Sequence, residues 1–465
     1  MFSASTYVRR RRRLYEADAP QRGLVLLLGN EQSPMNYADN PYPFRQDSTF
    51  LYYVGLDVPG LAAVLDLDTG STCLYGDDPT LDDAIWMGNQ TSRTDLAEAS
   101  GLSVTDDRSA LASNLTDALD ANRPIHFLPP YRPGQQVQLS SLLGLQPNRV
   151  ASYASLPLQK TVVRHRSQKT AEEVDQLELA LDATVRMHRS VFQNATPGTT
   201  ERALAGALAG RARAEGNGLS FRPTCSVHGE VLHNHEYQNT LQANDLLLVD
   251  AGAASPLHYA GDITRVTPVG GSFTSRQRDI YNAVLDAQDA AISALQPGRP
   301  FREIHLLAAE VLTEHLIELG LMQGTAADAV RAGAHALFFP HGLGHMLGLD
   351  THDMENLGED LVGYAPDQDR SSQFGLHTLR LARPLQSGFV VTIEPGCYFI
   401  PALINRWQAE NRHAEFINYD VVNDFVGMGG VRIEDDLLIT ADAARVLGPD
   451  LPKTAEAVEA AVATG

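Results

Sequence analysis

Four carboxylates and one imidazole in the second half of this 465-residue chain have the chemistry of a metal site. They are Asp250, Asp262, His345, Glu394 and Glu434. Each lies beside an apolar run or a glycine-containing turn, where a charge is costly to bury unless it is paired or bound to a cation. A cage dominated by oxygen suits Mn²⁺ or another divalent ion. Such a site indicates hydrolysis by a metal-activated water.

The elements around the two aspartates predict how they could meet. Residues 245–250 and 263–269 read as the arms of a hairpin, with Asp250 on one arm and Asp262 at the start of the other. Paired strands can direct two carboxylates at one point. Taken singly, either residue would read as an ordinary turn aspartate. Glu434 lies in a predicted strand over 431–439, where burial of an unpaired carboxylate would be unfavourable.

The segment 341–345 (HGLGH) places two histidines four residues apart. On a helix both would share a face, but two glycines disfavour a helix here. The pattern therefore predicts one metal ligand and one histidine facing a substrate. Two further histidines, His233 and His352, lie near the predicted ligands in sequence.

Hydrophobic periodicity and turn residues divide the chain into an α/β domain over 1–160 and a second domain over 161–465. Strands are expected at 23–29, 50–54, 62–67, 72–75, 124–128 and 389–393, and helices at 107–119, from Thr170 onward, at 200–212, 275–295 and 301–320. Thr170 with Glu173 forms a capping box at the helix that opens the second domain. Residues 354–378 read as a long polar excursion.

Composition excludes several classes of function. A net charge of −21 argues against nucleic-acid binding, which needs basic faces. No apolar run reaches the roughly 20 residues of a membrane helix. Three widely spaced cysteines fit a reducing compartment, so a cytoplasmic protein is expected. The run Arg9–Arg13 lacks a following apolar core, and we interpret it as a solvated helix face or surface patch rather than a signal peptide.

Several motifs resemble the pita-bread metallopeptidases (peptidase family M24), most closely prolidase and aminopeptidase P. They are 260–265 (AGDITR), 341–345 (HGLGH), 348–353 (GLDTHD) and 430–434 (GVRIE), with 44–48 (FRQDS) and 86–88 (WMG) in the first domain. The resemblance implies an α+β protein in which a smaller creatinase-like α/β domain precedes a pita-bread domain. It also implies two divalent ions (Mn²⁺, with Co²⁺ or Zn²⁺ as alternatives) and a homodimer formed through the N-terminal domain.

By position, Asp250 resembles the ligand of one metal ion, and Asp262 and Glu434 resemble the ligands that bridge both. His345 and Glu394 resemble the ligands of the other ion. Glu394 also resembles the residue that takes the proton of the attacking water, and His352 the residue that stabilises the tetrahedral intermediate. The resemblance implies that Thr264 holds Asp262 in place. The residues implied to bind substrate are His233, His341, His352, Arg380 and Arg432.

The resemblance implies cleavage of the X-Pro bond, and Arg380 bears on the length of the substrate. It lies fourteen residues before Glu394, where eukaryotic-type prolidases have an arginine that binds the free proline carboxylate. An arginine suits this task because it can donate two parallel hydrogen bonds. This favours a dipeptidase. The alternatives are a surface or ion-paired Arg380 in an aminopeptidase P, a metal-free binding module, and a creatinase-like hydrolase without metal. The sequence leaves organophosphate hydrolysis undecided.

Overall fold

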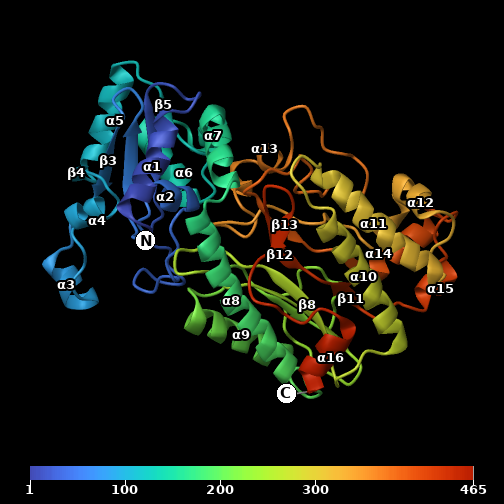
Figure 1. The fold of residues 1–465 in the computed structure, drawn as a ribbon. Coiled ribbons are helices and arrows are strands. Elements are labelled where there is room, and N and C mark those ends of the chain that lie inside the picture. The colour runs from blue at the N-terminus through green and yellow to red at the C-terminus, as the bar shows by residue number, and fades with distance from the viewer. Residues whose placement is uncertain (464–465) are drawn as a thin grey trace. The chain divides into compact units, whose positions relative to one another are not determined.

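The computed structural model describes residues 1–463 and contains two compact units. Unit 1 comprises Met1–Arg166 with the short segment Asn356–Gly358, and unit 2 comprises Ser167–Glu355 with the chain from Glu359 onward. Both units mix helices and strands (Figure 1). None of the helices among these residues is long and apolar enough to cross a bilayer.

Unit 1 is built on a five-stranded sheet in the order β4-β3-β2-β1-β5. Its strands are β1 (Leu24–Leu28), β2 (Ala62–Asp66), β3 (Ser71–Gly76), β4 (Val104–Asp107) and β5 (Ile125–His126). Its helices are α1 (Ala4–Tyr15), α2 (Ser48–Tyr53), α3 (Leu81–Met87), α4 (Arg93–Ala99), α5 (Ala110–Asp120), α6 (Pro133–Leu143), η1 (Pro147–Tyr153) and α7 (Leu156–Ser167). The continuous apolar run of β1 is buried on both faces, as expected for a central strand.

Two predictions for unit 1 are wrong. Residues 50–54 are not a strand but belong largely to α2, because Asp47 caps the helix by accepting a hydrogen bond from the Phe50 amide at 2.8 Å. The arginine run is not entirely solvated, since Arg10 and Arg11 are buried in α1. Arg10 donates to the Tyr52 carbonyl at 3.0 Å and Arg11 to that of Tyr53 at 2.9 Å. They satisfy carbonyls that the end of α2 leaves without helical partners.

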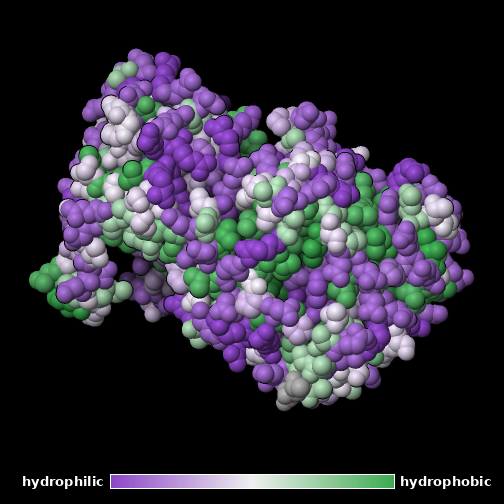
Figure 2. Space-filling view, viewed as in Figure 1, coloured by the Kyte–Doolittle hydropathy of each residue, from purple (hydrophilic) through white to green (hydrophobic). Residues whose placement is uncertain are grey.

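Helix α3 exposes a group of large apolar side chains. Figure 2 shows them as a green tip at the position that α3 has in Figure 1. The group consists of Leu81, Ile85, Trp86 and Met87. With 83% of its surface exposed, Trp86 buries little apolar area within its own unit.

Unit 2 contains three small sheets, ordered β6-β7-β8, β13-β12-β9 and β10-β11. The strands are β6 (Thr224–Ser226), β7 (Leu246–Ala251), β8 (Ile263–Pro268), β9 (Val390–Ile393), β10 (Gly396–Tyr398), β11 (Gly430–Arg432), β12 (Asp435–Ile439) and β13 (Ala444–Val446). The helices are α8 (Ala171–Asn194), α9 (Glu201–Glu215), α10 (Ser275–Ser293), α11 (Phe301–Glu318), α12 (Ala326–Ala332), η2 (Ala334–Leu337), η3 (Glu355–Leu357), α13 (Glu359–Gly363), α14 (Pro401–Ala409), α15 (Tyr419–Asn423) and α16 (Ala455–Ala463).

Helices enclose these strands from two sides. Helix α8 begins with the predicted capping box of Thr170 and Glu173, and it packs against β7 and β8. Helix α10 packs against β9, β10 and β11 (Figure 1). The predicted strand over 431–439 is two strands, β11 and β12, and Glu434 lies at the break between them. An isolated bridge pairs Glu434 with Thr264 of β8, so this break joins two sheets.

Candidate metal centre and substrate pocket

A cavity of about 460 Å³ in unit 2 brings most of the predicted site residues together. Ten of them line it: His233, Asp250, Asp262, His341, His345, His352, Arg380, Glu394, Arg432 and Glu434. Thr264 does not line it but lies directly behind the carboxylates. A cavity of this size accommodates a small peptide.

The β7–β8 hairpin positions the two aspartates. Asp250 pairs with Thr264 in the antiparallel register, and Asp262 lies just before β8. The turn between them doubles back through a bridge of Ala254 with Ala260. Gly252 is required here, because a Cβ at this position would lie 1.7 Å from the carbonyl oxygen of Gly261. The backbones of the two arms therefore approach more closely than side chains would allow.

His345 lies in an irregular segment that runs beside β9, which confirms that the HGLGH motif is not helical. Gly344 permits this approach, since a Cβ there would lie 2.0 Å from the Thr392 carbonyl oxygen. His345 Nδ1 lies 3.1 Å from the Met346 carbonyl oxygen. A carbonyl only accepts, so Nδ1 carries the hydrogen and Nε2 presents a lone pair. That Nε2 lies 3.5 Å from Asp262 and 3.6 Å from Glu394, as a shared metal ligand would.

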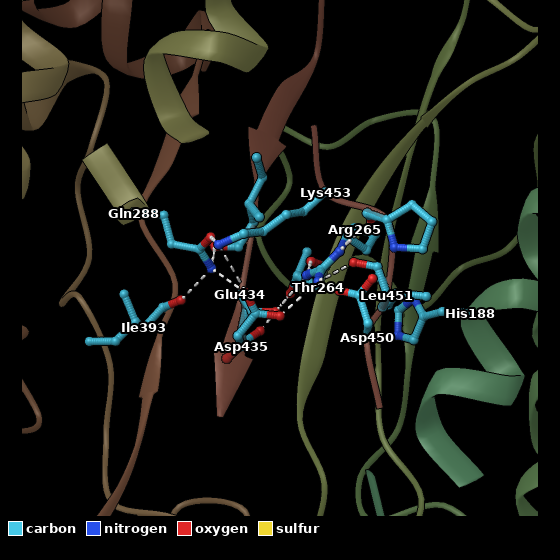
Figure 3. Close-up of polar contacts among 12 residues, drawn as sticks. His188, Thr264, Arg265, Gln288, Ile393, Glu434, Asp435, Asp450, Leu451 and Lys453 are labelled. Atoms are coloured by element: carbon cyan, nitrogen blue, oxygen red, sulfur yellow. Dashed lines mark hydrogen bonds and ion pairs between the residues drawn. The ribbon is translucent and has the colours of Figure 1, made fainter. Parts of the chain in front are cut away.

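Buried donors hold the backbone around Glu434 in place (Figure 3). Arg265 donates to the carbonyl oxygens of Thr264 and Glu434 at 3.0 and 2.8 Å, and to Asp435 at 2.7 Å. From the other side, Gln288 of α10 donates to the Ile393 carbonyl, next to Glu394, at 3.2 Å and to Asp435 at 3.1 Å. These bonds tie β8, β9 and β12 together directly behind the carboxylates of the cavity.

The donor set fits divalent cations. Ligand atoms of Asp262, His345 and Glu434 all lie within 4.8 Å of one another. The buried oxygens Asp250 Oδ1 and Asp262 Oδ1 accept no hydrogen bond within residues 1–463. Burial raises the pKa values of Asp262 and Glu434 well above their usual range, and repulsion from neighbouring carboxylates adds to this. Carboxylates this buried and this crowded need cations to stay ionised.

A series of hydrogen bonds leads from the predicted metal ligands to His341. Arg432, which is 4% exposed, donates to Asp250 at 2.6 Å, to the Thr264 hydroxyl at 3.1 Å and to the Tyr398 hydroxyl at 3.0 Å. His341 Nδ1 donates to the Gly342 carbonyl at 2.8 Å, so its Nε2 accepts from Tyr398 at 2.8 Å. Burial, and secondarily the charge of Arg432, lowers the pKa of His341 to about 3. His341 thus contributes a neutral ring to the cavity wall with both nitrogens engaged.

The prediction for Thr264 needs a correction. Its hydroxyl donates to Glu434 at 2.6 Å rather than to Asp262. The reason is geometric, because Thr264 is bridged to Glu434 across the sheet junction. The amide of Asp262 is instead bound by the Asp436 carboxylate at 3.0 Å.

His352 and Arg380 lie in the cavity wall with the predicted ligands. The His352 ring lies 4.2 Å from that of His345, and its pKa falls because burial and His345 oppose a positive charge. Arg380 Nη1 contacts Glu355 at 2.5 Å and Glu359 at 3.3 Å. Within the described chain, Nε and Nη2 of Arg380 make no hydrogen bond. Arg380 is thus both ion-paired and able to donate a second pair of hydrogens.

Comparison with known proteins agrees with this geometry. The model of metallopeptidase family M24 matches residues 175–441, and that of the aminopeptidase P N-terminal domain matches residues 7–126. The chain belongs to metallopeptidase family M24. Its fold is therefore an aminopeptidase P N-terminal domain followed by a pita-bread domain, which confirms the fold class expected from the sequence.

Relatives within the family are named for two different activities, Xaa-Pro dipeptidase and Xaa-Pro aminopeptidase. Human Xaa-Pro dipeptidase is 32% identical over 97% of this chain and 91% of its own length. Xaa-Pro aminopeptidase 1 of Streptomyces coelicolor is 30% identical over 97% of this chain and 85% of its own. A variant of Escherichia coli aminopeptidase P in complex with substrate superposes with a TM-score of 0.81 at 28% identity, over 100% of this chain and 99% of the other.

Sequence reasoning assigned no role to several residues that shape this site. Tyr398, Arg265, Asp436 and Glu355 each contact a predicted site residue or its backbone, and Gln288 donates to the Ile393 carbonyl next to Glu394. Only Asp436 carried a signal, as a second acidic residue in an apolar strand. The others act through contacts distant in sequence, which spacing alone does not reveal.

Proposed function

We propose that this M24 metallopeptidase is an Xaa-Pro dipeptidase. The observation that carries the proposal is that the acidic partners of the Arg380 guanidinium all lie on one of its nitrogens. Nη1 is held by Glu355 and Glu359, while the Nε–Nη2 edge remains available in the same cavity as the metal ligands. These two N–H groups are parallel and match the two oxygens of a free carboxylate. A dipeptide with C-terminal proline presents such a carboxylate one residue beyond the scissile bond.

The proposal includes two divalent ions, Mn²⁺ first, held by Asp250, Asp262, His345, Glu394 and Glu434. Four carboxylates surround the centre, and Arg432 is the one cation bonded to them among the described residues. The remaining charge of about −3 is balanced by two divalent ions together with one hydroxide, and not by a single divalent ion. Bound ions of this kind lower the pKa of water and polarise a carbonyl group.

Side chains of the protein then transfer the proton, stabilise the transition state, orient the ligands and contact the substrate. Glu394 takes the proton of the attacking water and delivers it to the proline nitrogen, which has no hydrogen in the peptide. Once protonated, with Nδ1 facing the Glu355 carboxylate, His352 can donate from Nε2 to the oxygen that becomes negative in the transition state. Arg432 and Thr264 hold Asp250 and Glu434 in their orientations. His233, an exposed side chain in the cavity wall, is proposed to contact the substrate.

Aminopeptidase P activity on longer X-Pro peptides is the second candidate. One observation favours it: Glu355 and Glu359 already neutralise much of the charge of Arg380. We also propose that the protein is a homodimer formed through unit 1, which the exposed apolar residues of α3 support. Light scattering on a purified sample tests the dimer.

Substitution of Arg380 tests the dipeptidase proposal. Arg380→Ala is expected to raise KM for Ala-Pro at least about tenfold, since a hydrogen bond to a charged group contributes about 1.5–3 kcal/mol. Cleavage of Ala-Pro-Ala should change little. Arg383→Ala is the matched control, because Arg383 donates to the Val362 carbonyl and does not line the cavity. Equal losses on both peptides in Arg380→Ala would refute the clamp.

A further inference from the structure

One carboxylate oxygen in unit 2 holds two groups of the cavity wall at once. Oε2 of Glu355 lies 2.5 Å from Arg380 Nη1 and 3.3 Å from His352 Nδ1. Arg380 and His352 are 28 residues apart in sequence, so this oxygen is a direct link between two separate segments. Glu355 itself does not line the cavity, and its side chain is only 19% exposed. It therefore acts on the substrate through Arg380 and His352.

The charges around Glu355 form two layers. Glu359 contacts Arg380 at 3.3 Å and also pairs with Arg370, and Arg370 contacts Asp360 at 2.7 Å. Among residues 1–463, Glu355 alone pairs with both Arg380 and His352. Glu359, Asp360 and Arg370 brace the arginine side of this arrangement from outside.

We propose that Glu355 is a positioning residue that sets substrate length, because it fixes the carboxylate-binding Arg380 relative to the carbonyl-facing His352. The inference rests on the proposed function, in which these two residues contact the two ends of the proline unit. A fixed distance between them suits a substrate whose free carboxylate lies one residue after the scissile carbonyl. If the link is broken, each side chain gains rotameric freedom and the preference for that length weakens.

The arrangement requires a carboxylate rather than a neutral amide. One ionised oxygen can accept from two donors, and both bonds are strengthened by its charge. A glutamine of the same shape has one accepting oxygen without the full charge, and its amide nitrogen cannot accept from an arginine or an N–H of histidine. Glu355→Gln therefore perturbs the link with minimal change in volume.

The matched control is Asp360→Asn, which removes the same charge five residues further along. Within the described part of the chain, the Asp360 side chain pairs with Arg370 and not with Arg380 or His352. In Glu355→Gln the ratio of kcat/KM for Ala-Pro over Ala-Pro-Ala is expected to fall about tenfold, the loss of one charge-assisted hydrogen bond. The change in KM should be confined to the dipeptide, whereas kcat should fall on both peptides through His352. Asp360→Asn should leave the ratio of kcat/KM for the two peptides within twofold of wild type. Glu355→Gln and Asp360→Asn should have the same melting temperature, so that a difference between them in activity is not a difference in stability.

A double variant and a structure separate this proposal from the dipeptidase assignment. In an Arg380→Ala background, Glu355→Gln should no longer change KM for either peptide. A crystal structure of Glu355→Gln should show Arg380 and His352 displaced from their present positions, whichever peptide the wild-type protein cleaves. Undisplaced side chains, or an unchanged KM effect in the Arg380→Ala background, would overturn the role of Glu355. Failure of the wild type to prefer the dipeptide would refute the dipeptidase assignment only.

Discussion

The ion pair of Lys169 with Asp353 leads to the most quantitative stability prediction. The Lys169 ammonium lies 3.0 Å from Asp353, and the two side chains are only 1% and 2% exposed. Asp353 directly follows His352, so the pair anchors a cavity-lining segment to the start of unit 2. Lys169→Met keeps most of the side chain but leaves the Asp353 carboxylate buried without the charge of the lysine. Breaking a buried pair in this way costs about 3–5 kcal/mol.

In Lys169→Met, the free energy of unfolding is expected to fall by an amount near the lower end of that range, about 3 kcal/mol. The reason is that Asp353 keeps a hydrogen bond from the Asp350 amide at 3.3 Å. Urea unfolding followed by tryptophan fluorescence measures the loss in unit 2. The chain has two tryptophans; Trp407 in α14 is 1% exposed, whereas Trp86 is 83% exposed before unfolding. The emission shift therefore reports mainly on Trp407.

Two further variants make the measurement decisive. Arg331→Met breaks an exposed pair, with side chains of Arg331 and Asp328 that are 74% and 52% exposed, and should cost less than about 1 kcal/mol. Adding Asp353→Asn to Lys169→Met removes the buried charge that has lost its lysine and should recover part of the stability. A loss in Lys169→Met no larger than that in Arg331→Met would refute the reasoning from burial.

Three other changes have expected outcomes. Glu394→Gln should lower kcat about 10²- to 10⁴-fold with an unchanged circular dichroism spectrum, whereas near-normal turnover would contradict its role as base. Tyr398→Phe removes the hydrogen bonds to His341 and Arg432, and should reduce kcat about 10- to 100-fold. A kcat within twofold of wild type would show that these hydrogen bonds are not needed for activity. Burial lowers the pKa of His165 to about 3, so the folded state binds fewer protons than the unfolded state below about pH 6.5. As the pH is lowered from 6.5 to 3, the free energy of unfolding should therefore fall by up to about 1.4 kcal/mol per pH unit, and it should fall less steeply in His165→Asn. Equal pH slopes of the unfolding free energy for the two proteins, measured by urea unfolding, would contradict this.

Local signals in the sequence predicted much of the fold. The capping box at Thr170 predicted the start of α8, and the apolar run 246–249 with its turn predicted the β7–β8 hairpin. These elements follow from contacts between residues close in sequence. Residues 50–54 show the opposite case, because a short aromatic run suits a strand or a helix equally and the Asp47 cap decides between them.

The candidate site was predicted as a set of side chains but not as a network. The five predicted ligands line one cavity, whereas the residues that support them come from distant segments, such as Tyr398 and Arg265. Long-range partners of this kind leave no periodic signal. Thr264 illustrates the limit: its importance was expected, but only the bridge between β8 and Glu434 shows which carboxylate it holds.

The most direct test of the function is the cleavage of Ala-Pro and Ala-Pro-Ala by the wild-type protein, loaded with Mn²⁺ or treated with EDTA. We predict that Ala-Pro is cleaved much faster than Ala-Pro-Ala, and that cleavage is lost with EDTA and restored by Mn²⁺. Equal or faster cleavage of the tripeptide would contradict the dipeptidase and favour an aminopeptidase. Absence of cleavage of either peptide, or cleavage that EDTA does not affect, would contradict a metal-dependent Xaa-Pro peptidase altogether.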